Sequence, residues 1–291
     1  MTHRKPETAA AVPARKFKLG SLRVYVGVVI ILVWGLAPFY WMAVTAFRDA
    51  SHTYDTTPWP THVTTKNFEN AFDTEKGSNF GRALVNSVII GGVTTLIALT
   101  IGVFAAYALA RITFRGRYVV AGLILSASMF PVVALVTPLF QLFTEVGWIG
   151  KYQAMIIPNI SFVLPMTVYI LASFFAELPW ELEEAARIDG ASRPQAFRLV
   201  MLPLAAPAVF TTAILAFIAA VNEFLLASLL SSDKTEPVTV AIARFSGNDP
   251  HDIPYAAIMA AGTIVTIPLV IMVLLFQRRI ISGLTAGGVK S

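Results

Sequence analysis

The sequence predicts an all-α membrane protein with six transmembrane helices. Three observations support this fold class. The 291-residue chain is 56% hydrophobic and only 13% charged, whereas a soluble domain carries about 25% charged residues. Six apolar segments are each long enough to cross a bilayer, which takes about 20 residues of helix. Lysine and arginine residues gather in short clusters beside these segments. A soluble fold this apolar would expose large apolar patches, so we expect much of the surface to face lipid.

We expect residues 1–23 to form an N-terminal tail, because they lack a sustained apolar pattern. The first span, 24–47, is too long for the core of a signal peptide and is interpreted as a retained anchor. An outer loop over residues 48–87 follows it. Each span must be helical, because lipid offers backbone groups no hydrogen-bond partner. The other five spans are expected at 88–109, 118–143, 154–175, 204–230 and 255–276.

The distribution of basic residues predicts the orientation of these spans. If the N-terminus is cytoplasmic, most of the 22 lysine and arginine residues fall on the inner side. Because inner segments of membrane proteins are enriched in these residues, we expect both termini to be cytoplasmic. The same orientation gives a charged inner loop at 176–203, an outer loop at 231–254 and a cytoplasmic C-terminal tail at 279–291.

Several function classes are disfavoured by what the sequence lacks. The chain has no cysteine, which excludes a thiolate metal site and a cysteine nucleophile. Its four histidines lie outside the apolar runs and are not spaced as metal ligands. No G-x-x-x-x-G-K-[ST] phosphate-binding loop, G-x-S-x-G elbow or H-E-x-x-H pair occurs. We therefore expect no catalytic residue, metal or cofactor on this chain, and its scattered basic residues do not favour nucleic acid as a partner.

The inner loop at 176–203 is highly charged for a short connection between two apolar spans. Pro179 suits the first turn of a helix, and Gly190 suits a left-handed cap at the end of that helix. Glu183 and Arg187 are four residues apart, in the order that favours an ion pair on a helix. The first part of the loop is therefore predicted to be a short helix that ends in a glycine turn.

The second part of the loop carries the signal for another helix. Ser192 and Gln195 have the spacing of a capping box, and Pro203 would end the helix just before the fifth span. The whole loop is thus predicted to be a helix, a glycine turn and a second helix on the cytoplasmic surface.

The first of these helices has an unusual face, with Leu182, Ala185, Ala186 and Asp189 at spacings of three and four. Small alanine side chains leave a shallow surface that suits docking into a cleft of another protein. The alternative is an amphipathic helix that rests on lipid headgroups. Such a helix usually has bulky apolar residues and a basic polar face, and this one has alanines and several acids. The composition therefore favours protein docking.

This loop resembles the EAA loop of ABC-importer permeases. In that family the pattern is E-A-A, three residues, G, nine residues and I-x-L-P. Here "EAARIDG" at 184–190 is followed by nine residues and "VMLP" at 200–203. The flanking "FFAELPWELEEAA", "NEFLLA" at 222–227 and the terminal "QRRIISGLTAGGVKS" resemble the maltose-importer type of carbohydrate permease. One departure is Val221, where that group usually has tryptophan. The matching residues are Glu184, Ala185, Ala186, Gly190, Leu202 and Pro203, with Val200 in place of isoleucine.

The resemblance implies the architecture of a type I ABC importer in a bacterial inner membrane, with a permease core at 84–278. It implies a second permease subunit in a heterodimer, two ATPase subunits that bind ATP and Mg, and an extracytoplasmic sugar-binding protein. The first loop helix would be the coupling helix held in the ATPase cleft. The residues implied for coupling are Glu184, Ala185, Ala186, Asp189 and Gly190. The substrate it implies is a disaccharide or oligosaccharide of the maltose or trehalose kind.

A candidate translocation pathway is marked by Asn222 and Glu223, which lie within the expected fifth span. Glu223 would lie about 12 Å from the outer end of a continuous helix. An ionisable group at that depth must face a partner or a wet cavity. Glu223 therefore either lines the pathway or forms a polar packing pair with a neighbouring helix, and the first interpretation is preferred. Weaker candidates are Asn159, Gln141, Ser128 and Ser161, since uncharged polar residues often join helices together.

Two rival classes of protein share some of these features. A stand-alone secondary transporter or channel would explain six spans and Glu223, but it leaves the charged inner loop without a role, and the sequence shows no internal repeat of matching length. An intramembrane enzyme would need a nucleophile–base pair or a metal cluster in a span, and none is present. The outer loop at 231–254 is either a simple connector or, as the resemblance implies, a segment that reaches toward the binding protein.

Overall fold

A computed structural model describes residues 19–73, 79–245 and 254–286. Within these ranges the regular structure is helical, and β-type pairing is limited to one isolated bridge between Arg48 and Val63. The all-α prediction is therefore confirmed. The longer helices are α1 (Leu19–Ala46), α3 (Phe80–Arg111), α4 (Arg117–Ser128), α5 (Val132–Glu145), α6 (Tyr152–Glu177), α9 (Leu202–Val221) and α12 (Tyr255–Ala286). The shorter ones are a 3-10 turn (Ala50–His52), α2 (Lys66–Ala71), α7 (Trp180–Ile188), α8 (Arg193–Ala196), a π-helical segment (Phe197–Met201), α10 (Leu225–Leu230) and α11 (Val238–Ala243).

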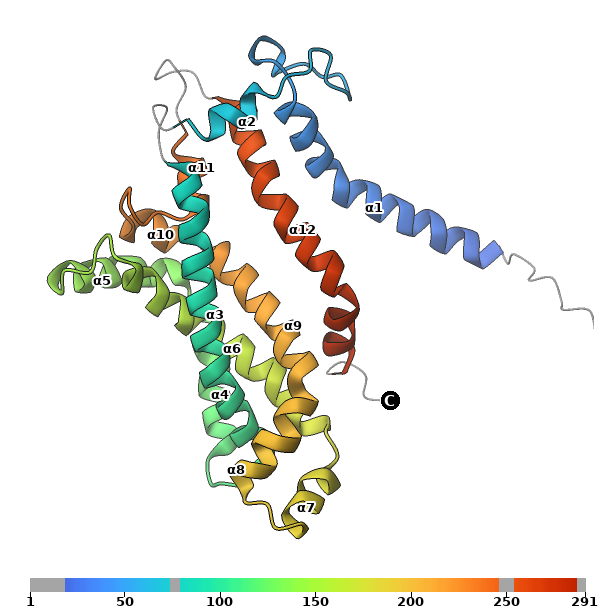
Figure 1. The fold of residues 1–291 in the computed structure, drawn as a ribbon, viewed down its shortest axis with the longest axis vertical. Helices are drawn as coiled ribbons and strands as arrows, with labels where there is room; N and C mark the ends of the chain where they lie inside the picture. The colour runs from blue at the N-terminus through green and yellow to red at the C-terminus, as the bar shows by residue number, and fades with distance from the viewer. Residues whose placement is uncertain (1–18, 74–78, 246–253, 287–291) are drawn as a thin grey trace, which may run out of the picture.

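Five helices in the described ranges are long and apolar enough to span a membrane, and the bent pair α4–α5 makes a sixth if it is counted as one span. In Figure 1, α3, α9 and α12 run between two ends of the molecule, with α7 and α8 at one end and α2 and α11 at the other. Helix α1 diverges from α12 along its length. Its apolar side chains are exposed in the isolated chain, as lipid or a second membrane subunit would require.

Helix α3 is the central element, and glycines allow its closest contacts. A Cβ atom on Gly102 would lie 2.6 Å from Thr167 Cγ2 of α6, and one on Gly91 would lie 2.6 Å from Val221 Cγ2 of α9. Small residues let the backbones of membrane helices approach closely, where dispersion contacts hold them together. The structure thus gives Val221 a packing role against Gly91.

Two apolar clusters hold the two ends of the bundle. The first joins α3, α5, α6, α10 and α11 near one end, through buried side chains that include Phe143, Met155 and Leu230. The second joins α3, α6, the π-helical segment and α9 near the other end, through Phe175 and Met201 among others. The second cluster includes Phe197 and Met201 of the charged loop itself, so it anchors the loop to α3 and α6.

The third span differs from the expected continuous helix at 118–143. It consists of α4 and α5, which meet at 86° across a break at 129–131. Pro131 explains the break, because it has no backbone N–H and disfavours helical geometry at the residue before it. Other prolines, such as Pro158 and Pro165 in α6, lie within helices that continue through them.

The fifth span also differs from the expected segment at 204–230. Helix α8, the π-helical segment and α9 run together from Arg193 to Val221, and the chain then leaves helical geometry before α10 begins at Leu225. The prediction that Pro203 ends a separate helix is wrong. Pro203 lies in the first turn of α9, and the Leu202 N–H donates to the Phe197 carbonyl, five residues earlier. This π-type turn lets the helix pass a residue that cannot donate a hydrogen bond.

The remaining boundaries differ less. Helix α3 begins at Phe80 rather than at 88, which shortens the outer loop expected at 48–87. Helix α12 runs from Tyr255 to Ala286 and so includes part of the expected tail at 279–291. Within the expected N-terminal tail, residues 19–23 are helical, and residues 1–18 lie outside the described ranges.

Candidate functional site

The candidate coupling helix α7 forms as the sequence predicts. It begins after Pro179 and ends at a left-handed Gly190, whose φ is +91°. The Ala191 N–H donates to the Ala186 carbonyl (2.9 Å), and the Gly190 N–H donates to the Arg187 carbonyl (3.1 Å). These bonds satisfy carbonyl groups that the end of a helix would otherwise leave free. The predicted glycine cap is confirmed.

All five predicted coupling residues lie on this one projecting element at the end of the bundle (Figure 1). Of these, Ala186 is half-buried, and the rest are exposed: Glu184, Ala185, Asp189 and Gly190. Ile188 projects beside them with 86% of its surface exposed. Leu182 on the same helix is 40% exposed, so α7 presents more than one apolar side chain at its surface.

One residue of α7 points in the opposite direction, and the sequence interpretation missed it. Glu183 is buried, and its Oε1 accepts a hydrogen bond from the Tyr107 hydroxyl of α3 at 2.8 Å. The predicted ion pair with Arg187 is wrong, since no N···O contact within 4.0 Å joins these two described residues. The spacing of residues in α7 gave no indication that Glu183 is buried, because an acidic residue ordinarily lies on the solvent-exposed face of a helix.

The loop continues into α8 through the predicted capping residues. The Ser192 N–H donates to Gln195 Oε1 at 2.8 Å, and the Ser192 hydroxyl contacts the same oxygen at 2.9 Å. The predicted pairing of Ser192 with Gln195 is therefore confirmed at the start of α8.

The candidate pathway residue Glu223 lies in the break between α9 and α10 rather than inside a helix. Its Oε1 accepts the Leu226 N–H at 2.8 Å, and its Oε2 accepts the Ala227 N–H at 3.0 Å. The carboxylate thus satisfies two donors of the first turn of α10. This arrangement is neither a packing pair with a neighbouring helix nor an unpaired charge, and it corrects the expected helical environment of Glu223.

The other candidate pathway residues do not form one group. Asn159 is buried in α6 and lines a small cavity together with Glu223. Asn222 is exposed, and its side chain donates to the Ile218 carbonyl of its own helix at 2.8 Å. Gln141 is exposed on α5. The structure therefore brings Asn159 and Glu223 together, and the role of all four residues in translocation stays a prediction.

The weaker candidates also bond within their own helices. Ser128 donates to the Leu125 carbonyl at 2.6 Å, and Ser161 lies 3.4 Å from the Ile157 carbonyl.

The segment at 231–245 is fastened by an asparagine that the sequence interpretation also missed. Asn86 is buried in α3, and its amide donates to the carbonyls of Lys234 (3.1 Å) and Glu236 (2.9 Å). Its Oδ1 accepts the Tyr152 hydroxyl of α6 at 2.6 Å. Asn86 falls in the loop expected at 48–87, where an amide is unremarkable, and its burial follows from α3 beginning at Phe80. This part of the expected loop at 231–254 is thus a fixed element, and residues 246–253 lie outside the described ranges.

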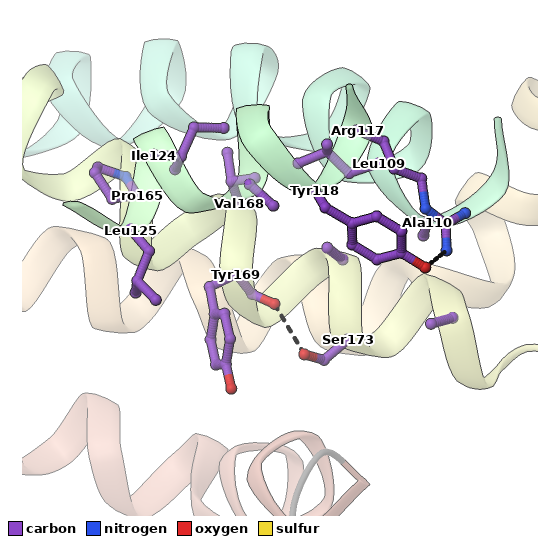
Figure 2. Close-up of a pocket in the computed structure, with 13 residues that line it drawn as sticks. Leu109, Ala110, Arg117, Tyr118, Ile124, Leu125, Pro165, Val168, Tyr169 and Ser173 are labelled. Carbon is purple, nitrogen blue, oxygen red and sulfur yellow. Dashed lines mark hydrogen bonds between the residues drawn. The ribbon is translucent and has the colours of Figure 1, made fainter. Parts of the chain in front are cut away.

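A largely apolar groove is lined by α3, α4 and α6. Figure 2 shows Tyr118 across one end of it, where Arg117 donates to the Tyr118 hydroxyl at 2.8 Å. Leu109, Ile124 and Val168 are among the apolar side chains that line it. None of the four candidate pathway residues lines this groove, so it does not coincide with the predicted pathway.

No three side chains of the His, Asp or Glu type gather at coordinating distance in the described ranges. His52 and His62, which the sequence separates by nine intervening residues, stack with their ring centroids 4.0 Å apart in the outer loop.

Comparisons with known proteins agree with this arrangement. Residues 98–285 match the profile of the family described as the inner membrane component of binding-protein-dependent transport systems. The chain is 42% identical to the trehalose transport system permease protein of Mycobacterium tuberculosis, over 90% of this chain and 94% of that one. It is also 42% identical to the trehalose/maltose transport system permease protein of Thermococcus litoralis, over 95% and 99%.

A solved structure supports the same fold. A chain from a bacterial ABC transporter that imports the acidic polysaccharide alginate superposes with a TM-score of 0.73, at 20% identity, over 92% of this chain and 99% of that one. The chain described here therefore belongs to the family of binding-protein-dependent transport system inner membrane components, which are multi-pass permeases of ABC transporters.

Proposed function

We propose that this chain is a permease subunit of an ATP-driven importer for a disaccharide or oligosaccharide of the trehalose or maltose type. The observation that carries the proposal is α7, a short helix with an exposed alanine face that is closed by a left-handed glycine at the inner end of the bundle. The chain itself has no phosphate-binding loop. A docking helix on a chain without an ATP-binding motif therefore supports ATP hydrolysis by a separate subunit.

The proposed complex follows from the family. It holds a second permease subunit, two ATPase subunits that bind ATP and Mg, and an extracytoplasmic binding protein that delivers the sugar. The two termini and the α7 loop lie on the cytoplasmic side, where the ATPases are. Relatives support the substrate class, because two chains at 42% identity are permeases for trehalose or for trehalose and maltose.

The test is uptake of labelled sugar by liposomes that hold either this chain alone or the complete complex. The complete complex is expected to accumulate trehalose or maltose only with ATP on the α7 side and the loaded binding protein on the other. The chain alone is expected to bind no ATP and move no sugar. Gradient-driven uptake by the chain alone would instead establish a secondary transporter.

The same liposomes test the sugar class by competition. Unlabelled trehalose and maltose are expected to reduce uptake more than diacetylchitobiose, which a 32% identical relative takes up, or sulfoquinovosyl glycerol, which a 37% identical relative transports. The reverse order would contradict the assigned substrate class.

A further inference from the structure

Two side chains near the inner end of α3 face the coupling helix. Tyr107 and Arg111 are four residues apart, so they lie on the same face of α3, one turn from each other. Tyr107 contacts Glu183 of α7, and Arg111 lies over the ring of Trp180 of α7 with its guanidinium carbon 4.7 Å from the ring centroid. Trp180 and Glu183 are three residues apart and share one face of α7. Two residues of α3 are therefore matched to two residues of α7.

Arg111 also joins α3 to the end of α6. Its Nε donates to the Phe175 carbonyl at 2.8 Å, and its Nη2 donates to the Leu178 carbonyl. These carbonyls belong to the last turn of α6, where helices leave acceptors unpaired. A buried guanidinium is well suited to this position, since it supplies several donors and a positive charge at the negative end of a helix.

The aromatic ring of Tyr107 packs against rings of α6 and of the π-helical segment. The ring centroid lies 4.6 Å from that of Phe197 in the π-helical segment and 5.8 Å from that of Phe175 in α6. Its hydroxyl holds Glu183, which is only 6% exposed and whose Oε2 has no hydrogen-bond partner. One phenol therefore contacts α6, α7 and the segment that leads into α9.

A buried carboxylate with a single hydrogen bond is a costly way to pack a helix, and an apolar side chain would stabilise the same contact at lower cost. A directional bond, however, fixes both the position and the rotation of α7 relative to α3. Helix α7 is otherwise held by the Trp180 ring beneath Arg111 and by the short turns at 178–179 and 189–192. The ring contact is less directional than a hydrogen bond, so without the Tyr107–Glu183 bond α7 could rotate about its connecting turns while α3 stayed in place.

We propose that Tyr107 and Glu183 form a latch that makes α7 move as one body with α3 and the start of α9, with Arg111 holding the end of α6 in the same unit. Tyr107, Glu183 and Arg111 are then positioning residues for coupling. This inference rests on the proposed function, in which α7 receives the movement of an ATPase.

The test separates a latch from a merely structural contact. Tyr107→Phe keeps the ring and removes the hydroxyl, which leaves the buried Glu183 without a partner and should lower thermal stability. Combining Tyr107→Phe with Glu183→Met removes both polar groups at nearly constant shape, so stability and assembly should recover. The directional bond is still absent in this double variant. We expect the amount of sugar imported per ATP hydrolysed to fall about tenfold. A factor of this size corresponds to the net free energy of one hydrogen bond.

Matched control variants separate the loss of the Tyr107–Glu183 bond from the general effect of removing a hydroxyl or a carboxylate. Tyr169→Phe and Glu177→Met remove the same groups from exposed positions of α6, where neither side chain has a described hydrogen bond, and both should keep the wild-type ratio of sugar imported to ATP hydrolysed. Glu183→Gln keeps an acceptor for the Tyr107 hydroxyl. Its ratio of sugar imported to ATP hydrolysed should therefore lie closer to wild type than that of the double variant.

The outcomes distinguish the latch from the proposed function. Ala185→Arg, which alters the exposed docking face, is measured in the same complex. If Ala185→Arg abolishes ATPase association and the double variant keeps wild-type stability and the wild-type ratio, the latch is overturned and the coupling role of α7 stands. If Ala185→Arg changes neither association nor transport, the proposed docking of α7 is itself overturned.

Discussion

Gly190→Pro is expected to release the ATPase subunits from the membrane complex. The native φ of Gly190 is +91°, whereas a proline ring fixes φ near −65°. The substitution also removes the N–H that donates to the Arg187 carbonyl and disfavours the helical geometry of Asp189. The end of α7 must therefore change direction, and the docking face with it. We expect at least about a tenfold fall in ATPase co-purification, which corresponds to a loss of about 1.4 kcal/mol.

A matched control is available at Gly116. Its φ is +89°, and it begins α4 in the neighbouring turn after α3, outside the loop that carries α7. Gly116→Pro imposes the same backbone conflict there and should leave ATPase association intact. Gly190→Ala should have a smaller effect than Gly190→Pro, since alanine in a left-handed conformation costs about 1–2 kcal/mol but keeps the N–H. Wild-type co-purification and stimulated ATP hydrolysis in Gly190→Pro would contradict the role of this turn.

Glu223→Ala is expected to lower the melting temperature of the assembled complex. The carboxylate accepts the N–H groups of Leu226 and Ala227, and alanine leaves both donors without that partner. Loss of a side-chain cap at a helix start costs about 0.5–2 kcal/mol. Glu223→Gln retains one acceptor oxygen and should fall between alanine and wild type.

Melting and uptake are measured together on these variants, with Glu145→Ala as the control. Glu145 is an exposed carboxylate at the end of α5, and it has no described hydrogen bond. We expect its melting temperature to equal that of wild type. A Glu223→Ala complex with unchanged melting but altered uptake would show that the carboxylate serves the pathway rather than α10. That result would contradict the capping role assigned here.

Helix existence and the coupling loop were predictable because their signals are local. Apolar length identifies a span, and the Pro179 and Gly190 positions follow from backbone conformations that few other residues share. The breaks at 129–131 and 222–224 were harder to predict. Both lie inside apolar runs of suitable length, and similar prolines in α6 do not end their helix. Whether a proline bends or breaks a helix depends on which neighbours satisfy the freed backbone groups.

The buried polar contacts could not be predicted from spacing alone. Glu183 has the sequence context of a solvated acid, yet it faces Tyr107, which is far away in the chain and was interpreted only as part of an apolar span. Glu223 was recognised as unusual, but its partners are backbone donors that exist only because the chain leaves the helix at Asn222. Such contacts depend on tertiary arrangement, and no periodicity in one segment encodes them.

The most direct test of the account is to identify what α7 touches in the assembled complex. The chain has no native cysteine, so Ile188→Cys places a single thiol on a side chain that is 86% exposed. A photoactivatable reagent attached to this thiol is irradiated, and the adduct is identified by mass spectrometry. Asp233→Cys, whose native side chain is exposed in the outer segment, serves as the control. The account predicts that Ile188→Cys links to an ATPase subunit and that Asp233→Cys never does. Adducts of Ile188→Cys with lipid alone, in a complex that contains the ATPase, would contradict it.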